Sequence, residues 1–140
     1  MKKIVVTQRL LENESYHEVR EALDINYCSL LQECGYLPIV LPYEVDFKKY
    51  FNDIGIDGVL LSGGNDLNVC SKNSLSKKRD EFEVELLEYC IEQKIPVFGI
   101  CRGMQLIAHY FGSSFKKVEN EVNVRNKLIV KSGSLYVSTK

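Results

Sequence analysis

The chain has 140 residues, of which 45% are hydrophobic and 26% charged; this balance predicts one globular domain over residues 1–140 and excludes a disordered or fibrous protein. Eighteen basic and nineteen acidic residues leave a net charge of −1, and without a long block of like charge we expect neither nucleic acid nor a membrane surface among the partners. The apolar runs are far shorter than the roughly 20 residues of a membrane helix, and Met1 leads directly into an expected strand rather than a signal sequence, so we expect a cytoplasmic protein.

The first half of the chain predicts alternating strands and helices. Residues 3–7 (KIVVT) form a β-branched run typical of a strand buried in a parallel sheet. Ser15 followed by Glu18 matches a capping box, and apolar residues at helical spacing follow, so we expect one long amphipathic helix that ends at Gly35. Three shorter elements come next: a strand at 37–41, a short helix at 47–51 and a strand at 58–61.

The second half continues the same alternation. After a polar loop at 65–76, the apolar pattern predicts a helix at 79–94, a buried strand at 97–100 and a helix at 102–111. Two further short strands are expected in the tail, at 115–118 and 127–130. This order predicts the α/β class with a doubly wound, mostly parallel sheet.

The five cysteines, at positions 28, 34, 70, 90 and 101, form an odd set without C-x-x-C pairs, so we expect neither a disulfide framework nor a metal site. Cys101 differs from the rest because it is the centre of G-x-C-x-G, between a predicted strand and a predicted helix. This is the context of a nucleophile elbow, whose flanking glycines, here Gly99 and Gly103, avoid a steric collision in the turn. A helix N-terminus also favours a thiolate. The alternative is a buried structural cysteine.

A thiolate that attacks a carbonyl creates an oxyanion, which needs two hydrogen-bond donors. The backbone N–H of Arg102 is one candidate, because it follows the cysteine directly. The second candidate is the N–H of Gly64, with Gly63 next in order, because this pair ends a neighbouring predicted strand. An ordinary turn after the strand is the alternative interpretation of the two glycines.

Two runs of the sequence, DGVLLSGGNDL at 57–67 and RDEFEVELLEYCIEQKIPVFGICRGMQLIAHYFG at 79–112, resemble the class I glutamine amidotransferase-like superfamily. The arginine after the cysteine and the R-D-x-F-E run favour its γ-glutamyl hydrolase branch, peptidase family C26. The resemblance implies a flavodoxin-like fold and a reaction in which Cys101 forms a γ-glutamyl thioester that water hydrolyses to glutamate. It implies a small γ-glutamyl substrate and no metal or organic cofactor.

The resemblance also suggests substrate contacts. Gln105 matches a family position that lines the glutamyl pocket, although the residue alone fits a solvated helix position equally well. Arg79 and Asp80 either hold the glutamyl α-amino and α-carboxylate groups or form an ion pair that docks their helix. Asn65 and Asp66 either shape the rim of the pocket or form a simple Asx turn.

One part of the family pattern is missing. The family supplies its histidine base and acidic partner from an H-x-E sequence far beyond the cysteine, and this chain contains only His17 and His109. His109 lies too far along its helix to reach Cys101, and His17 is expected at the start of the first long helix without a partner. We therefore expect a C-terminally truncated form of a longer hydrolase, with self-association through the face that truncation exposes.

The sequence is compatible with three functions. The N-terminal run KKIVVTQRLLENESYHEVREALD resembles a narrower group of hydrolases, in which the leaving group is a cytidine diphosphoramidate used in capsule synthesis. A second reading is a glutaminase subunit that delivers ammonia to a synthase. A third is a fragment that binds a γ-glutamyl ligand without turnover.

Overall fold

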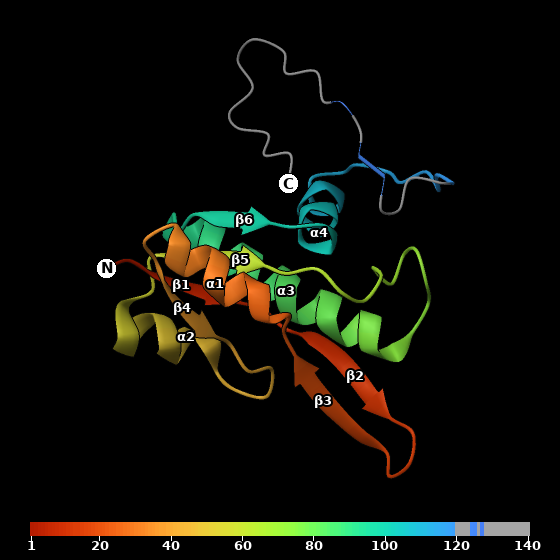
Figure 1. The fold of residues 1–140 in the computed structure, drawn as a ribbon, viewed down its shortest axis with the longest axis horizontal. Coiled ribbons are helices and arrows are strands. Elements are labelled where there is room, and N and C mark those ends of the chain that lie inside the picture. Colours follow the sequence, from red (N-terminus) through yellow and green to blue (C-terminus); the bar gives the residue numbers. More distant parts are fainter. Residues whose placement is uncertain (120–123, 126, 128–140) are drawn as a thin grey trace.

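A computed structural model describes residues 1–119, 124, 125 and 127 of the chain. Its centre is a parallel sheet of four strands in the order β4-β1-β5-β6 (Figure 1). The strands are β1 (Lys3–Val6), β4 (Leu37–Val40), β5 (Gly58–Leu61) and β6 (Val97–Gly99). All four lie within or beside the segments predicted as strands, so the α/β class with a parallel sheet is confirmed.

Helices cover the two faces of the sheet unequally. On one face, the larger apolar cluster contains Val5, Val59 and Leu61 of the strands. These residues pack against α2 (Phe47–Tyr50), a π-helical turn η1 (Phe51–Gly55), α3 (Ser74–Gln93) and α4 (Arg102–Tyr110). On the other face, Val6 and Leu60 pack against α1 (Ile25–Glu33). Alternate residues of each strand point to opposite faces, which explains why the strands read as continuous apolar runs.

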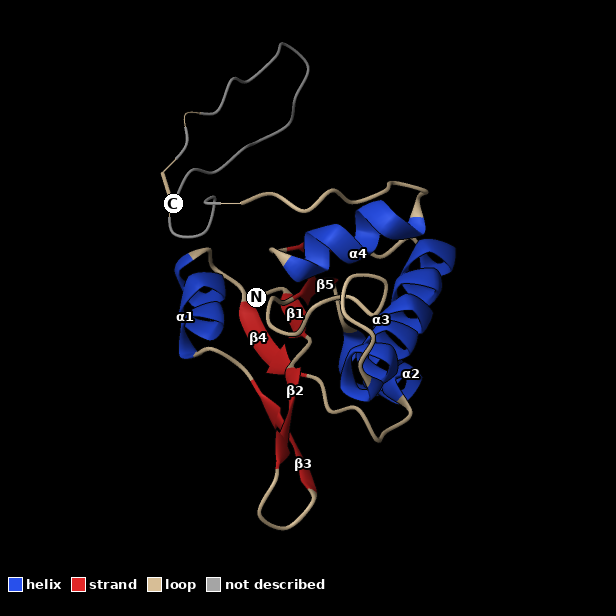
Figure 2. Ribbon diagram, turned by 90° about the vertical axis from the view of Figure 1, so that its right-hand side faces the viewer, coloured by secondary structure: helices blue, strands red, loops and turns tan. Residues whose placement is uncertain are grey.

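The prediction of one long helix from Ser15 to Gly35 is wrong for its first half. Residues there form an antiparallel hairpin of β2 (Arg9–Asn13) and β3 (Glu18–Ala22), which projects from the body of the molecule (Figures 1 and 2). The apparent capping box falls in the hairpin turn, where the side chain of Asn13 accepts a hydrogen bond from the N–H of Ser15. Helix α1 begins later, and its N-cap is Asp24, which accepts a hydrogen bond from Asn26 N.

The tail also departs from the prediction. No strand forms at 115–118; instead the ring of Phe115 packs 5.7 Å from that of His109, at the end of α4. Apart from residue 127, the strand predicted at 127–130 lies outside the described residues. Helix α3 begins five residues earlier than predicted, because Asn73 provides an N-cap for Leu75 and Ser76.

Over β5 and β6, the face that carries α1 holds an apolar groove of about 830 Å³. Phe98 of β6 lies along it with 66% of its surface exposed, and Ile4, Leu60 and Ile100 form its floor. β6 is the last strand of the described sheet. Self-association through this face stays a prediction. Among the described helices, none is both long enough and apolar enough to cross a membrane.

Candidate active site

Cys101 forms the junction between β6 and α4. Its backbone has φ 53° and ψ −109°, a region that a cysteine rarely adopts, and the residue is the N-cap of the helix. The side chain is exposed, whereas Cys90 in α3 is buried. The predicted strand, strained turn and helix are therefore present around the sulfur atom.

Gly99 and Gly103, on either side of Cys101, leave no room for a side chain. A β-carbon on Gly99 would lie 2.4 Å from the carbonyl carbon of Gly103, and one on Gly103 would lie 2.1 Å from the carbonyl oxygen of Leu61. Both distances are far below van der Waals contact. The elbow is thus packed directly onto the backbone of β5, which fixes where Cys101 sits relative to the end of that strand.

The two glycines that follow β5 lie beside the elbow. A β-carbon on Gly63 would lie 3.5 Å from Cys101 Cβ. The backbone N–H of Gly63 donates to the hydroxyl of Tyr27 at 2.8 Å. Gly64 has φ +104°, which favours glycine. Among the described residues, the N–H groups of Gly64 and Arg102 have no acceptor. Their role as oxyanion donors stays a prediction.

Arg79 is completely buried and its guanidinium holds the turn after β5. Its Nε donates to Glu83, and Nη1 donates to the carbonyl of Gly63 at 2.8 Å and to Asn65 at 3.3 Å. Nη2 donates to the carbonyl oxygen and the hydroxyl of Ser62. All five N–H groups are therefore used inside the protein, and none is left to bind a substrate, so the docking role is the one that fits.

The predicted ion pair between Arg79 and Asp80 is wrong, because neighbouring residues of a helix point in different directions. Asp80 instead pairs with the guanidinium of Arg102, which is 1% exposed and also pairs with Glu83. Glu83 therefore bridges two arginines. This buried network joins α3 to the first turn of α4 and to the turn after β5.

Two other predicted contacts lie as follows. Asn65 accepts from the N–H of Leu10 at 2.9 Å and donates to its carbonyl at 2.8 Å, so its amide ties the hairpin to the turn after β5. Gln105 lies half-buried in α4, one turn after Cys101, and has no side-chain hydrogen bond with any described residue. Its contact with a glutamyl group stays a prediction. Asp66 is exposed.

Neither histidine lies at the sulfur atom. His109 is exposed near the end of α4, about 12 Å along the helix axis from Cys101, and its ring lies 3.5 Å from the carbonyl of Ser113. His17 lies in the hairpin turn, with φ 49°, rather than at a helix start as predicted. The described residues therefore contain no histidine in the position of a base.

Burial changes two other titratable groups. Burial raises the pKa of the Cys90 thiol to about 12, and burial together with the charge of Glu83 raises the pKa of the Tyr43 hydroxyl. Both groups stay neutral at physiological pH and belong to the core rather than the site. Among the described residues, no cluster of three or more histidine, cysteine or acidic side chains could hold a metal ion.

Sequence reasoning missed Tyr27 and the pairing of Glu83. The spacing of four residues between Arg79 and Glu83 could have indicated their ion pair. No local pattern could have placed the Tyr27 hydroxyl on Gly63, since the two residues are far apart in the chain.

Comparison with known proteins shows which family the chain resembles. A family model described as peptidase C26 matches residues 4–136. The chain is 48% identical over 122 residues to a gamma-glutamyl-CDP-amidate hydrolase of Campylobacter jejuni, a match that covers 85% of this chain and 60% of that protein.

Two further relatives are more distant. A glutamine amidotransferase-like protein of Rickettsia prowazekii is 33% identical over 118 residues, covering 76% of this chain and 41% of that protein. The glutamine-hydrolyzing GMP synthase of Plasmodium falciparum is 43% identical over 75 residues, covering 54% and 12%. The chain thus spans 60% or less of the length of these three relatives.

Proposed function

The chain belongs to the peptidase C26 family, and we propose that it carries the nucleophile of a hydrolase that cleaves a γ-glutamyl amide bond and releases glutamate. The observation that supports this most strongly is the exposed Cys101 in a strained elbow, packed beside the turn at Gly63 and Gly64. A buried structural cysteine would need neither the strain nor the exposure.

In the first step, the Cys101 thiolate attacks the γ-carbonyl carbon and a C–S bond forms. The negative charge moves to the carbonyl oxygen, where the N–H groups of Arg102 and Gly64 stabilise it. The C–N bond then breaks, and the departing nitrogen takes up a proton. In the second step, water attacks the thioester carbonyl carbon and gives one proton to a base. The C–S bond then breaks, which releases glutamate and the Cys101 thiolate.

The buried ion network supports this reaction indirectly. Arg79 holds the carbonyl groups of Ser62 and Gly63, and Arg102 is held by Asp80 and Glu83. Both candidate oxyanion donors therefore belong to segments whose positions the same network fixes. Gln105, one turn along α4, is the residue we assign to the glutamyl group.

The reaction also needs one acid–base group, which protonates the departing nitrogen as an acid and then activates water as a base. His17 and His109 are both distant from Cys101 in the described structure, so we assign the base to a histidine outside these residues. The described part of the chain is then expected to bind a γ-glutamyl ligand weakly and to turn over slowly.

For the leaving group we propose a cytidine diphosphoramidate nitrogen, as in the Campylobacter relative named gamma-glutamyl-CDP-amidate hydrolase. Such a nucleotide substrate belongs to the cytoplasm, and its phosphoramidate product would serve capsule synthesis. A glutaminase that supplies ammonia is the second candidate, favoured by the similarity to a glutamine-hydrolyzing synthase. A synthase that binds the chain and increases glutamine hydrolysis would favour this second candidate.

The test is hydrolysis of a γ-glutamyl anilide, followed by the release of the aniline. We expect slow hydrolysis by the 140-residue chain, a faster rate when imidazole is added as an external base, and none with Cys101→Ala. A chain that continues into an H-x-E segment is expected to need no imidazole. Equal rates for the original chain and Cys101→Ala would refute the proposed nucleophile.

A further inference from the structure

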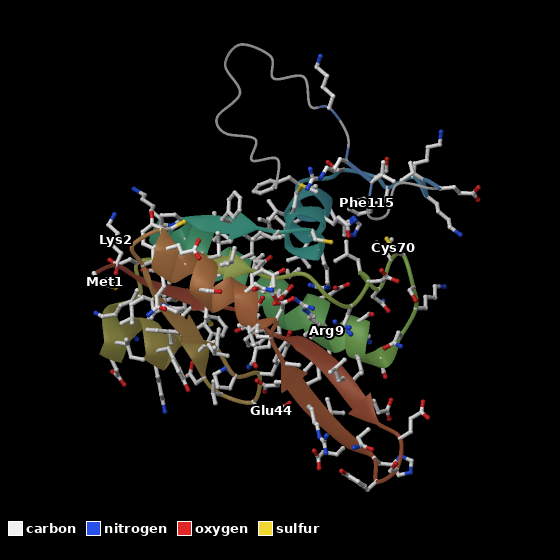
Figure 3. The ribbon with its side chains drawn as sticks, in the orientation of Figure 1. Met1, Lys2, Arg9, Glu44, Cys70 and Phe115 are labelled. Carbon is white, nitrogen blue, oxygen red and sulfur yellow. The ribbon has the colours of Figure 1, made fainter. Side chains whose placement is uncertain are left out.

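Arg9 begins β2, where the chain leaves the carboxyl end of β1 and the hairpin projects from the body (Figure 3). The side chain is exposed and, within the described part of the protein, forms no ion pair or hydrogen bond. It lines a cavity of about 400 Å³ together with Tyr27, Gly63 and Gly64. An unpaired cation therefore lies in a cavity next to the candidate oxyanion site.

The position of Arg9 is fixed by its neighbours. A β-carbon on Gly64 would lie 2.7 Å from Arg9 Cβ and 3.2 Å from Arg9 Cδ, so the arginine stem packs directly over this glycine. The next residue, Leu10, is held through both its backbone N–H and its carbonyl by Asn65. The guanidinium is thus attached to a rigid base rather than to a loose loop.

The cavity lies on the opposite side of Cys101 from the residue assigned to the glutamyl group. Gly63 lies between Cys101 and Tyr27. A β-carbon added to Gly63 would lie 3.5 Å from Cys101 Cβ and 3.0 Å from the Tyr27 hydroxyl oxygen. Tyr27 belongs to α1 on one face of the sheet, whereas Gln105 belongs to α4 on the other. The cavity at Tyr27 and the position of Gln105 therefore lie on different sides of the contact between Gly63 and Cys101.

The groups in the cavity match an anion. A guanidinium without a carboxylate partner binds phosphate oxygens through paired N–H donors. The Tyr27 oxygen accepts from Gly63 N–H, which leaves its own O–H to donate. Asp24 is the one acidic residue of the lining, and it caps α1 by accepting from Asn26 N.

We propose that Arg9 and Tyr27 form a subsite for a phosphate group of the leaving group, on the side of Cys101 away from Gln105. This inference rests on the proposed hydrolase function and its phosphate-bearing leaving group, and it adds the residues that bind that group. Because the ligand is held mainly by charge at an exposed site, binding should weaken as salt is added.

The experiment is calorimetric titration of the 140-residue chain with CDP, with inorganic pyrophosphate and with glutamate, each measured separately. We expect Arg9→Met to weaken binding of CDP and pyrophosphate about tenfold or more, Arg9→Lys to retain part of it, and glutamate binding to stay the same. The matched control is Arg20→Met, which removes the same charge from the same hairpin at a residue already paired with Glu18 and Tyr16.

Three results would overturn the proposal. The first is an absence of binding of both CDP and pyrophosphate to the original chain. The second is an equal loss in Arg9→Met and Arg20→Met, which indicates net charge alone. The third is a loss of glutamate binding in Arg9→Met with CDP binding unchanged, which would place the carboxylate at Arg9. Binding to Cys101→Ala is measured alongside, since an Arg9-dependent subsite persists there even if the hydrolase mechanism fails.

Discussion

The carboxylate of Glu83 lies between two buried guanidinium groups, and replacing it tests whether the ion network stabilises the fold. Glu83→Gln keeps the size of the side chain and removes its charge. Arg79 then has no carboxylate partner, and Arg102 keeps only Asp80, although its Nε already lacks a hydrogen-bond partner among the described residues.

Removing one partner of a buried ion pair typically costs about 3–5 kcal/mol. That is a large share of the roughly 5–15 kcal/mol by which a domain is stable, and it corresponds to a fall in Tm of roughly 10 °C or more. We therefore expect Glu83→Gln to be the most destabilising loss of a single carboxylate in α3.

The measurement is urea denaturation at neutral pH beside a matched control, Glu85→Gln. Glu85 lies in the same helix but is exposed, and its pair with Lys48 has an N–O distance of 3.6 Å. Exposed pairs contribute about 0–1 kcal/mol, so the control should unfold almost as the original chain does. If the two variants differed by less than about 1 kcal/mol, the network would not stabilise the fold as argued.

Three further predictions follow from packing and burial. Gly103→Ala should destabilise the protein and lower the iodoacetamide reactivity of Cys101, because the added carbon meets the Leu61 carbonyl at 2.1 Å; normal stability and reactivity would contradict this packing. Burial of the neutral Cys90 thiol should stabilise the fold below the unfolded thiol pKa of about 8.5, and this stabilisation should be lost as pH rises toward the folded pKa of about 12. Cys90→Val should therefore lose less stability than the original chain between pH 9 and 11, as measured by thermal unfolding. Phe98→Lys should reduce self-association in sedimentation velocity, because this ring is 66% exposed on the open apolar face; an unchanged oligomeric state would exclude that face.

The sequence predicts the elements whose signal is local. The central strands β1 and β5 read as apolar runs because both of their faces are covered. The outer strands β4 and β6 are also apolar runs, although Val40 and Phe98 are exposed, and α4 follows from an apolar stripe that ends before Gly112. The hairpin could not be predicted in this way, since Ser15 and Glu18 imitate a helix start. The contact that holds it, between Asn65 and Leu10, joins residues 55 positions apart.

The same distinction applies to the site. The elbow at Cys101 is encoded in five consecutive residues and could be predicted. The roles of Arg79 and Arg102 could not, because their partners come from α3 and from the turn after β5, which the fold brings together. The subsite at Arg9 likewise depends on Tyr27 of α1, whose position follows only once the hairpin is placed.

Cys101 is proposed here as the nucleophile of a glutamyl-binding site. This role is tested most directly by treating the chain with a diazoketone analogue of glutamine and locating the adduct by peptide mass spectrometry. We expect one adduct, on Cys101, formed more slowly when glutamate is present and absent in Cys101→Ser. An adduct on Cys28 or Cys70, or labelling of Cys101 that glutamate does not slow, would contradict it.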